Sequence, residues 1–295
     1  MHASLEPASH YFYSDRLKLQ FWDWGTNGKP VLILVHGTRD HARSWDWIAR
    51  ALRDDFHVYA SDLRGHGNSA WAPGALYSIQ EHIFDLTVFV DIIGKHPVRL
   101  IGHSLGAIVS LYFSGTYPEK VAKLVAIEGV GVGPLGSPPK PAPERMLSWI
   151  EKTRHVEEHH SRSYPTFAAA VARMREANPF LSEEVAEHLT LHGTNWNADG
   201  SLVWKFDNYT RVIHPFGLDL NEAVQLLERI ECPTLLFWGK QSFARDPDVD
   251  PQAAAIRNKS IVKFDQAGHW LHHDQLELFL QETKSFLAAK ERERT

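Results

Sequence analysis

The chain has 295 residues, of which 43% are hydrophobic and 23% are charged, and its formal net charge is −5. These values are typical of a globular protein, and without a basic block they disfavour nucleic acid or an anionic membrane as the main partner. The single cysteine, Cys232, excludes an intrachain disulfide. The N-terminus lacks a signal-peptide pattern, and the longest aliphatic run, residues 31–35, is too short to span a bilayer. We therefore expect a cytoplasmic protein without a membrane span.

The first 130 residues alternate short apolar runs with segments of helical periodicity. Runs that are apolar throughout are typical of strands buried on both faces of a parallel sheet, whereas residues 17–24 alternate and predict a strand with one solvated face. Ser78 and Glu81 have the spacing of a capping box, and Gly94 marks a helix stop. The predicted elements are, in order, strands at 11–13, 17–24 and 31–35, a helix at 42–52, a strand at 56–60, a helix at 78–93, a strand at 98–101, a helix at 107–113 and a strand at 121–127.

A change of composition divides the remainder. Residues 131–143 are rich in glycine and proline, which indicates a linker, and residues 144–230 predict several helices without an apolar strand. Ser182 and Asp219 have the places of helix N-caps. The alternation of strands and helices then resumes, with strands predicted at 234–238 and 261–264 and helices at 251–257 and 276–289. We predict an α/β fold with a mostly parallel sheet and helices on both faces, made of residues 1–130 and 231–295, with a helical lid at residues 131–230.

One pentapeptide carries most of the chemical information. Gly102-His-Ser-Leu-Gly106 follows a buried strand and opens an apolar helix, which is the context of the nucleophile-elbow motif G-x-S-x-G. The turn must be tight for the hydroxyl of Ser104 to project above the sheet edge, and the two glycines let the backbone approach its neighbours. The strand and helix on either side favour a catalytic serine over a glycine-rich turn with a solvated one.

The order of four motifs resembles the α/β-hydrolase superfamily from about Tyr11 to Ala289. His36-Gly37 follows a strand, Asp62-Leu-Arg-Gly-His-Gly-Asn-Ser69 follows the next one, the elbow comes third, and Gly268-His269 precedes the last helix. The resemblance implies a serine hydrolase that needs no metal or organic cofactor. We interpret the Asp62 motif as structural, with the carboxylate bonded to backbone groups of its own turn.

The resemblance also implies the roles of individual residues. Ser104 would be the nucleophile and His269 its general base, since a hydroxyl is inert at neutral pH without one. The backbone N–H groups of Thr38 and Leu105 would form the oxyanion hole. Among the 18 histidines, His269 is distinguished by its place before the last helix. We expect His272 and His273 to lie on a helix surface.

The third member of the triad departs from the commoner pattern of the family. Relatives place an aspartate shortly after the seventh strand, where this chain has Ser242. A minority take the acid from the end of the sixth strand, the position of Glu128. We predict that Glu128 orients His269, and Asp246 and Asp248 stay as alternatives if the loop at residues 241–245 folds back.

A competing motif lies in the lid. Residues 155–159, His-Val-Glu-Glu-His, match the H-x-x-E-H pattern of some zinc proteases, because histidines four apart share one helix face. Short histidine patterns arise easily in a chain with 18 histidines, so we interpret the segment as a solvated helix face and expect no metal site. The aromatic residues of the lid divide between its own core and an apolar pocket, in proportions that the sequence does not settle.

The predicted substrate is a small or medium carboxylic ester. Thioester, lactone or carbon–carbon bond hydrolysis would use the same residues, and the fold does not choose among them. Dehalogenase and epoxide hydrolase activities are disfavoured because family members with those activities have an aspartate in place of Ser104. A non-catalytic receptor for a small ligand is the alternative from another class, distinguished by binding without turnover. The sequence does not indicate an oligomeric state.

Overall fold

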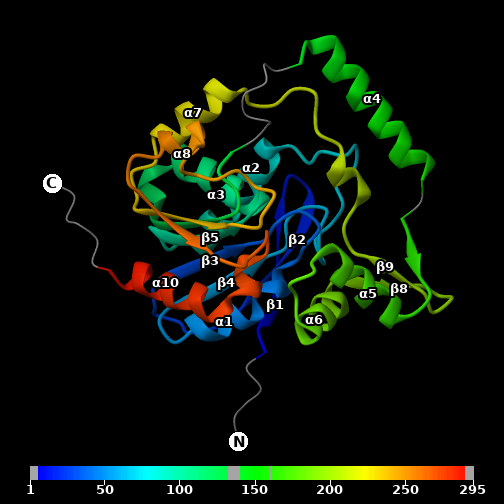
Figure 1. The fold of residues 1–295 in the computed structure, drawn as a ribbon, viewed down its shortest axis with the longest axis horizontal. Helices are drawn as coiled ribbons and strands as arrows, with labels where there is room; N and C mark the ends of the chain where they lie inside the picture. The colour runs from blue at the N-terminus through cyan, green and yellow to red at the C-terminus, as the bar shows by residue number, and fades with distance from the viewer. Residues whose placement is uncertain (1–5, 132–139, 160, 290–295) are drawn as a thin grey trace, which may run out of the picture.

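A computed structural model describes residues 6–131, 140–159 and 161–289. It is built around one eight-stranded sheet with the order β1-β2-β4-β3-β5-β6-β10-β11 (Figure 1). β1 and β2 form the antiparallel edge, and every pair from β4 onward is parallel. The strands are β1 (Ala8–Ser14), β2 (Leu17–Asp23), β3 (Val31–Val35), β4 (His57–Ser61), β5 (Val98–His103), β6 (Val121–Ile127), β10 (Thr234–Gly239) and β11 (Lys259–Phe264).

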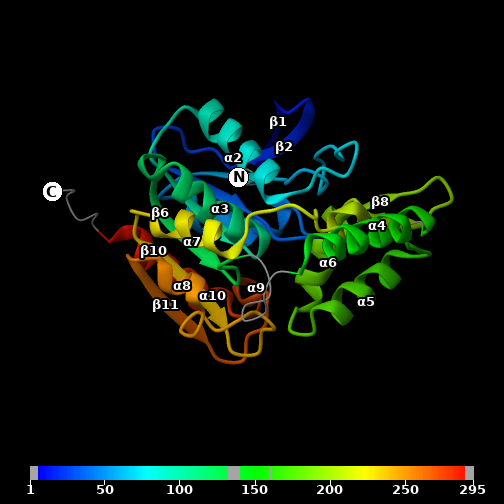
Figure 2. The ribbon, with the colours of Figure 1, turned by 90° about the horizontal axis from the view of Figure 1, so that it is seen from above.

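Helices cover both faces of the sheet, which explains why its central strands are apolar throughout. Every residue of β3 and β6 is buried, as expected for strands packed on both sides. One face is covered by α2 (Ile79–Ile93), α3 (Leu105–Thr116), α7 (Leu220–Glu228) and α8 (Pro251–Ala255) (Figures 1 and 2). The other is covered by η1 (Ala42–Trp45), α1 (Asp46–Leu52), α9 (Leu271–Asp274) and α10 (Leu276–Ala288). The fold class is therefore the predicted one.

The predicted helix ends are confirmed where capping residues defined them. The Glu81 carboxylate accepts a hydrogen bond from the Ser78 amide at 2.8 Å, and Gly94 ends α2 with a left-handed φ of 64°. Ser182 and Asp219 cap α6 (Glu183–Gly193) and α7 through side-chain oxygens. The helix predicted at residues 42–52 is divided into the 3₁₀ turn η1 and the helix α1.

The segment between β6 and β10 differs from its prediction in two respects. It contains a small antiparallel sheet of β7 (Ser163–Tyr164), β9 (Leu202–Trp204) and β8 (Thr194–Trp196), where we expected no strand. Strands of two or three residues are too short to show alternation. α7 lies within the range predicted for the lid but packs on α3. The two helices are so close that a Cβ at Gly115 of α3 would overlap the backbone of Leu226 of α7. The remaining elements are η2 (Pro118–Lys120), α4 (Ala142–Glu158), α5 (Phe167–Ala177), α6 and η3 (Asn208–Arg211).

The lid elements from α4 to η3 stand beside the carboxyl ends of the parallel strands, with α4 reaching away from the sheet (Figures 1 and 2). Most of the linker predicted at residues 131–143 lies outside the described residues, as do residues 160 and 290–295. Within the described part of the chain, no helix is long and apolar enough to cross a membrane.

Candidate active site

Ser104 occupies a strained turn between β5 and α3. Its φ of 51° and ψ of −114° lie outside the regions that non-glycine residues favour, as a nucleophile elbow requires. The flanking glycines explain how the turn fits. A Cβ at Gly102 would overlap the backbone of Gly106, and a Cβ at Gly106 would overlap the carbonyl oxygen of Val35. Larger residues at either position would push α3 away from β3 and β5.

Glu128 follows β6, the strand adjacent to β5. The Ser104 amide donates to the Ile127 carbonyl at 2.8 Å, so the glutamate begins next to the elbow. Its side chain is fully buried, and its Oε2 lies 3.2 Å from Nδ1 of His269, whose side chain is 9% exposed. The Gly239 amide donates to Oε1 at 2.5 Å. The arrangement fixes one ring nitrogen of His269 against a carboxylate and leaves Nε2 for proton transfer.

Ser242 is a residue whose role sequence reasoning missed. It stands where relatives have the triad aspartate, and its hydroxyl donates a short hydrogen bond to Glu128 Oε2. The same hydroxyl accepts from the Ala244 amide at 3.0 Å, which ties the loop after β10 to the carboxylate. The sequence signal for this role was a serine at the position where the resemblance predicts an aspartate, since a serine hydroxyl can donate to a carboxylate from the neighbouring strand.

The alternative acids lie elsewhere. Asp246 and Asp248 form ion pairs with Nζ of Lys263 on β11, at 2.8 and 2.5 Å. Their side chains are 29% and 57% exposed, unlike the buried side chain of Glu128. The carboxylate that contacts His269 therefore comes from β6.

Thr38 and Leu105 flank the nucleophile from two elements. Leu105 is the first residue of α3, whose N-terminus carries a partial positive charge. Thr38 follows Gly37, where a Cβ would lie 3.1 Å from Cβ of Ser104, so the loop after β3 runs beside the serine. The positions suit two backbone donors for a developing oxyanion, as predicted from the resemblance.

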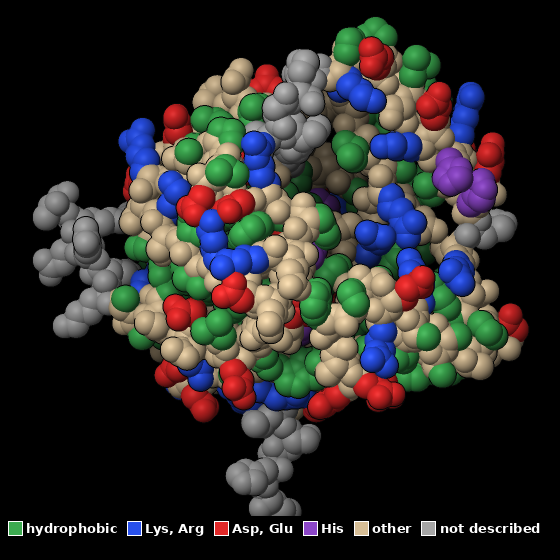
Figure 3. All heavy atoms as spheres, viewed as in Figure 1, with side chains coloured by type: hydrophobic (Ala, Val, Ile, Leu, Met, Phe, Trp, Pro, Cys, Tyr) green, Lys and Arg blue, Asp and Glu red, His purple; other side chains and the backbone are tan. Residues whose placement is uncertain are grey.

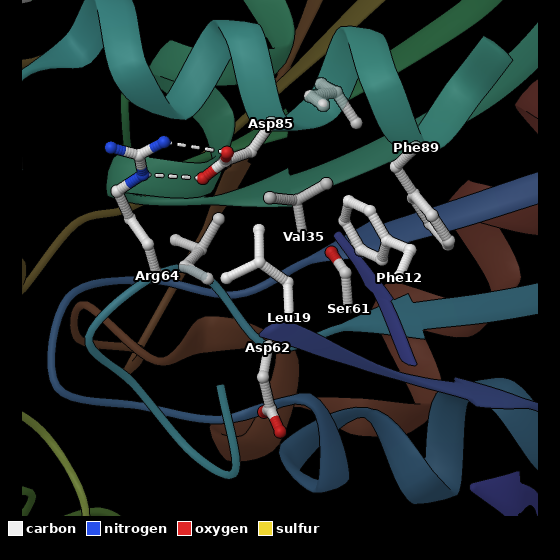
Figure 4. A pocket seen from close by; sticks show the side chains of 10 residues that line it. Phe12, Leu19, Val35, Ser61, Asp62, Arg64, Asp85 and Phe89 are labelled. Atoms are coloured by element: carbon white, nitrogen blue, oxygen red, sulfur yellow. Dashed lines mark hydrogen bonds and ion pairs between the residues drawn. The ribbon is translucent and has the colours of Figure 1, made fainter. Parts of the chain in front are cut away.

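Asp62 is confirmed as a structural residue, with a wider reach than predicted. Its carboxylate accepts from the Asn68 amide at 3.0 Å in its own loop and from the Ala42 amide at 2.7 Å in η1. Burial raises its pKa to about 6. Figure 4 shows this carboxylate pointing away from an enclosed space of about 10 Å³, beside which Arg64 donates to Asp85 at 2.6 and 2.8 Å. That space is too small for a substrate.

Aromatic side chains surround the histidine. The exposed ring of Phe243 lies 4.3 Å from the ring of His269, measured between centroids. From the lid, Phe180 approaches the loop before His269, where a Cβ at Gly268 would lie 3.2 Å from its ring. The lid therefore contributes to the surroundings of the site.

A cavity of about 480 Å³ adjoins Glu128. It lies between α3, the end of β10 and α8, and its lining is partly apolar and partly polar. Its lining includes Ile108, Gly129, Trp238, Phe243, Arg245 and Gln252. The cavity is large enough for a small organic group, and it opens beside the carboxylate that holds His269.

His272 contradicts the expectation of a surface residue. It is fully buried, its ring stacks on Trp45 with 5.0 Å between centroids, and neither ring nitrogen has a hydrogen-bond partner among the described residues. Burial lowers its pKa well below the usual value. His273 is half-buried, and burial lowers its pKa to about 3. The short helix α9 packs against the core, and the two adjacent histidines in the sequence do not predict that burial.

Three residues could together hold a metal ion. Asp46 on α1 and His188 and His192 on α6 place one ligand atom each within 4.8 Å of the others. The Asp46 carboxylate already accepts hydrogen bonds from Arg43 at 2.6 to 2.9 Å, so a cation would compete with that guanidinium. The rings of His155 on α4 and His159 directly after it are exposed, with 4.1 Å between their centroids, and among the described residues they belong to no three-ligand group.

Comparisons with known proteins identify the family to which this fold belongs. The chain is 31% identical to serine hydrolase-like protein 2 of Homo sapiens over 60% of its length and 57% of that protein. It is 25% identical to esterase Rv0045c of Mycobacterium tuberculosis over 85% of its length and 80% of that protein. The solved thioesterase domain from the curacin biosynthetic pathway superposes with a TM-score of 0.83 at 23% identity, over 95% of this chain and 99% of that one. The family model of the α/β-hydrolase fold matches residues 30–276, and the chain therefore belongs to that family.

Proposed function

We propose that this hydrolase is a serine esterase in which Ser104, His269 and Glu128 form the catalytic triad. The observation that carries the proposal is the 3.2 Å contact between His269 Nδ1 and the buried carboxylate of Glu128. Glu128 directly follows β6, and β6 pairs with β5, the strand that leads into the strained turn at Ser104. A carboxylate in that place fixes the tautomer of the imidazole and stabilises the imidazolium that forms during the reaction.

The reaction proceeds in two stages. Ser104 Oγ attacks the ester carbonyl carbon while its proton passes to His269 Nε2, and the Thr38 and Leu105 amides donate to the oxyanion. The carbon–oxygen bond then breaks, and the alcohol leaves with the proton from His269. Water attacks the acyl-enzyme, gives one proton to the same nitrogen and releases the acid. His269 returns that proton to Ser104, so the enzyme is regenerated.

The substrate is a small or medium carboxylic ester, with part of it in the cavity beside Glu128. A volume of about 480 Å³ is at the lower end of the range of small-molecule sites, which favours short chains over long lipids. Thioesters and lactones could enter the same site, since their carbonyl groups need the same nucleophile and oxyanion donors.

A fluorophosphonate probe tests the nucleophile. We expect it to label Ser104 alone, and we expect Ser104→Ala to lose both labelling and steady turnover of p-nitrophenyl esters of two to eight carbons. Labelling that survives in the variant would show that another residue is the nucleophile. Saturable ester binding without steady product release by the wild-type chain would favour a receptor, and it would contradict an esterase.

A further inference from the structure

A buried histidine precedes the proposed nucleophile. His103 is the last residue of β5 and is followed directly by Ser104. Small areas of histidine are visible within the hollow beside the lid (Figure 3), whereas His103 lies in the interior with 1% of its surface exposed. Its Nε2 lies 2.9 Å from the backbone carbonyl oxygen of His269. The neighbour of the proposed nucleophile in the chain therefore contacts the main chain of the proposed base.

The hydrogen bond shows which ring nitrogen of His103 carries the proton. Burial lowers the pKa of His103 well below its usual value, so the ring is neutral at pH 7 and has a single N–H. A carbonyl oxygen can only accept, so the proton is on Nε2 and is donated to His269. Nδ1 is buried and has no hydrogen-bond partner among the described residues. The single N–H of His103 is therefore engaged by the backbone of the base.

The same imidazole packs against the loop after β3. A Cβ at Gly37 would lie 2.8 Å from Nδ1 and 3.2 Å from Cε1 of His103, so the ring touches the backbone at this glycine. Thr38, one of the two proposed oxyanion donors, comes next in the chain. One side chain thus contacts both the loop that leads to an oxyanion donor and the loop that carries the base.

His269 is held at its ring and at its backbone by different groups. Glu128 holds the ring through Nδ1 at 3.2 Å, but this contact leaves the backbone free to shift, because the side-chain torsions can compensate. The preceding amide, that of Gly268, donates to Asp274 at 2.9 Å within the same loop and helix. The bond from His103 instead comes from the end of a buried strand, which is a rigid part of the sheet.

We propose that His103 is a positioning residue, which holds the backbone of His269 so that Nε2 of the base stays within reach of the Ser104 hydroxyl. Proton transfer needs a separation of about 2.6 to 3.2 Å between the two heavy atoms, and a displacement of about 1 Å lowers a rate by about 100-fold. Because His103 is adjacent to Ser104, its hydrogen bond ties the base to the nucleophile directly. This inference rests on the proposed esterase function and adds a residue to it.

Two substitutions separate the hydrogen bond from the volume of the ring. In His103→Phe a ring fills the space without a donor, whereas in His103→Gln an amide can donate to the same carbonyl. With p-nitrophenyl butyrate we expect His103→Phe to lower kcat about 10- to 100-fold while KM stays within about threefold. His103→Gln should restore most of the lost kcat. The rate of fluorophosphonate labelling should follow kcat in both variants, because labelling also requires an activated Ser104.

His272→Phe is the matched control. The ring of His272 is fully buried, its centroid lies 4.6 Å from that of His103, and it has no hydrogen-bond partner among the described residues. This variant should keep the kcat and KM of the wild-type protein. The comparison shows whether the loss in His103→Phe comes from the missing donor or from the removal of any buried imidazole in this part of the core.

A measurement on the wild-type protein does not depend on how the variants fold. Nitrogen NMR of isotope-labelled histidine distinguishes the two ring tautomers, and the signal of His103 is the one that His103→Gln lacks. We expect a proton on Nε2 and none on Nδ1 at pH 7. A proton on Nδ1 would overturn the proposal, as would a wild-type kcat in His103→Phe or equal losses in His103→Phe and His103→Gln. Turnover that survives in Ser104→Ala would instead contradict the proposed function.

Discussion

Acidification from pH 7 to pH 5 should strongly destabilise this protein, because its core holds neutral histidines. Burial lowers the pKa of His41 to about 3 and that of His66 to about 4, so both stay neutral in the folded state at pH 5. In the unfolded chain a histidine titrates near pH ~6.5 and takes up a proton. Stability is therefore present above that pH and is lost as the pH falls. Burial lowers the pKa of six other histidines and acts in the same direction: His36, His82, His103, His192, His272 and His273.

The size of the effect follows from linkage. Each histidine that stays neutral at pH 5 costs about 2 kcal/mol relative to pH 7, so His41 and His66 together cost about 4 kcal/mol, and the other buried histidines add to this loss. Buried carboxyl groups oppose this, because burial raises the pKa of Asp40 to about 7 and that of Asp62 to about 6. They take up protons only when folded, which returns about 4 kcal/mol. The histidines with lowered pKa values outnumber the buried carboxyl groups with raised ones, so the net effect of acidification is a loss of stability, of which a typical domain has about 5 to 15 kcal/mol.

Urea unfolding at pH 7 and pH 5 measures this loss, and His272→Phe tests its origin. The phenyl ring keeps the contact with Trp45 and cannot titrate, so the loss between the two pH values should fall by about 2 kcal/mol. His155→Phe, on the exposed side of α4, is the control and should leave the loss unchanged. If His272→Phe shows the same pH dependence as the wild-type protein, the assignment of a neutral buried histidine is refuted.

Other changes probe the site. Glu128→Gln should lower kcat by several orders of magnitude, by analogy with the roughly 10,000-fold loss in serine proteases, while Asp246→Asn stays within about tenfold; the reverse result in an ester assay would contradict the triad. EDTA should leave turnover unchanged, and an inactivation that zinc reverses would show a metal requirement. Gly106→Ala should cost at least about 3 kcal/mol in a urea titration, because its Cβ would overlap the Val35 carbonyl oxygen. Gly217→Ala, with open space around it, should change stability by less than about 0.5 kcal/mol.

The sequence predicted the parts of the fold that obey simple periodicities. Fully apolar runs such as β3 and β6 indicated buried parallel strands, and the glycines of the elbow indicated a tight turn. The short strands of the lid sheet were not predictable, since they owe their existence to pairing between distant segments. The burial of His272 was missed for the same reason, because it depends on where α9 lies against Trp45.

The site was predictable to a similar degree. The order of the motifs predicted Ser104 and His269, and the resemblance to family members with the acid after the sixth strand predicted Glu128. The bond from Ser242 to that carboxylate and the approach of Phe180 from the lid both depend on loop conformations that carry no local pattern.

The proposed use of the carboxylate of Glu128, which follows β6, has a consequence for how this hydrolase could diversify. In a protein whose acid follows β10, the loop after that strand must keep one carboxylate in one place, and substitutions there endanger catalysis. Here the loop after β10 contributes Ser242 as a hydrogen-bond donor to Glu128, and it does not have to supply the carboxylate itself. The same loop supplies Phe243, Ala244 and Arg245 to the wall of the cavity. Mutations at these three positions could alter which substrates fit while the contact between the proposed acid, Glu128, and the proposed base, His269, is kept. This loop is therefore the natural place to begin directed evolution of specificity.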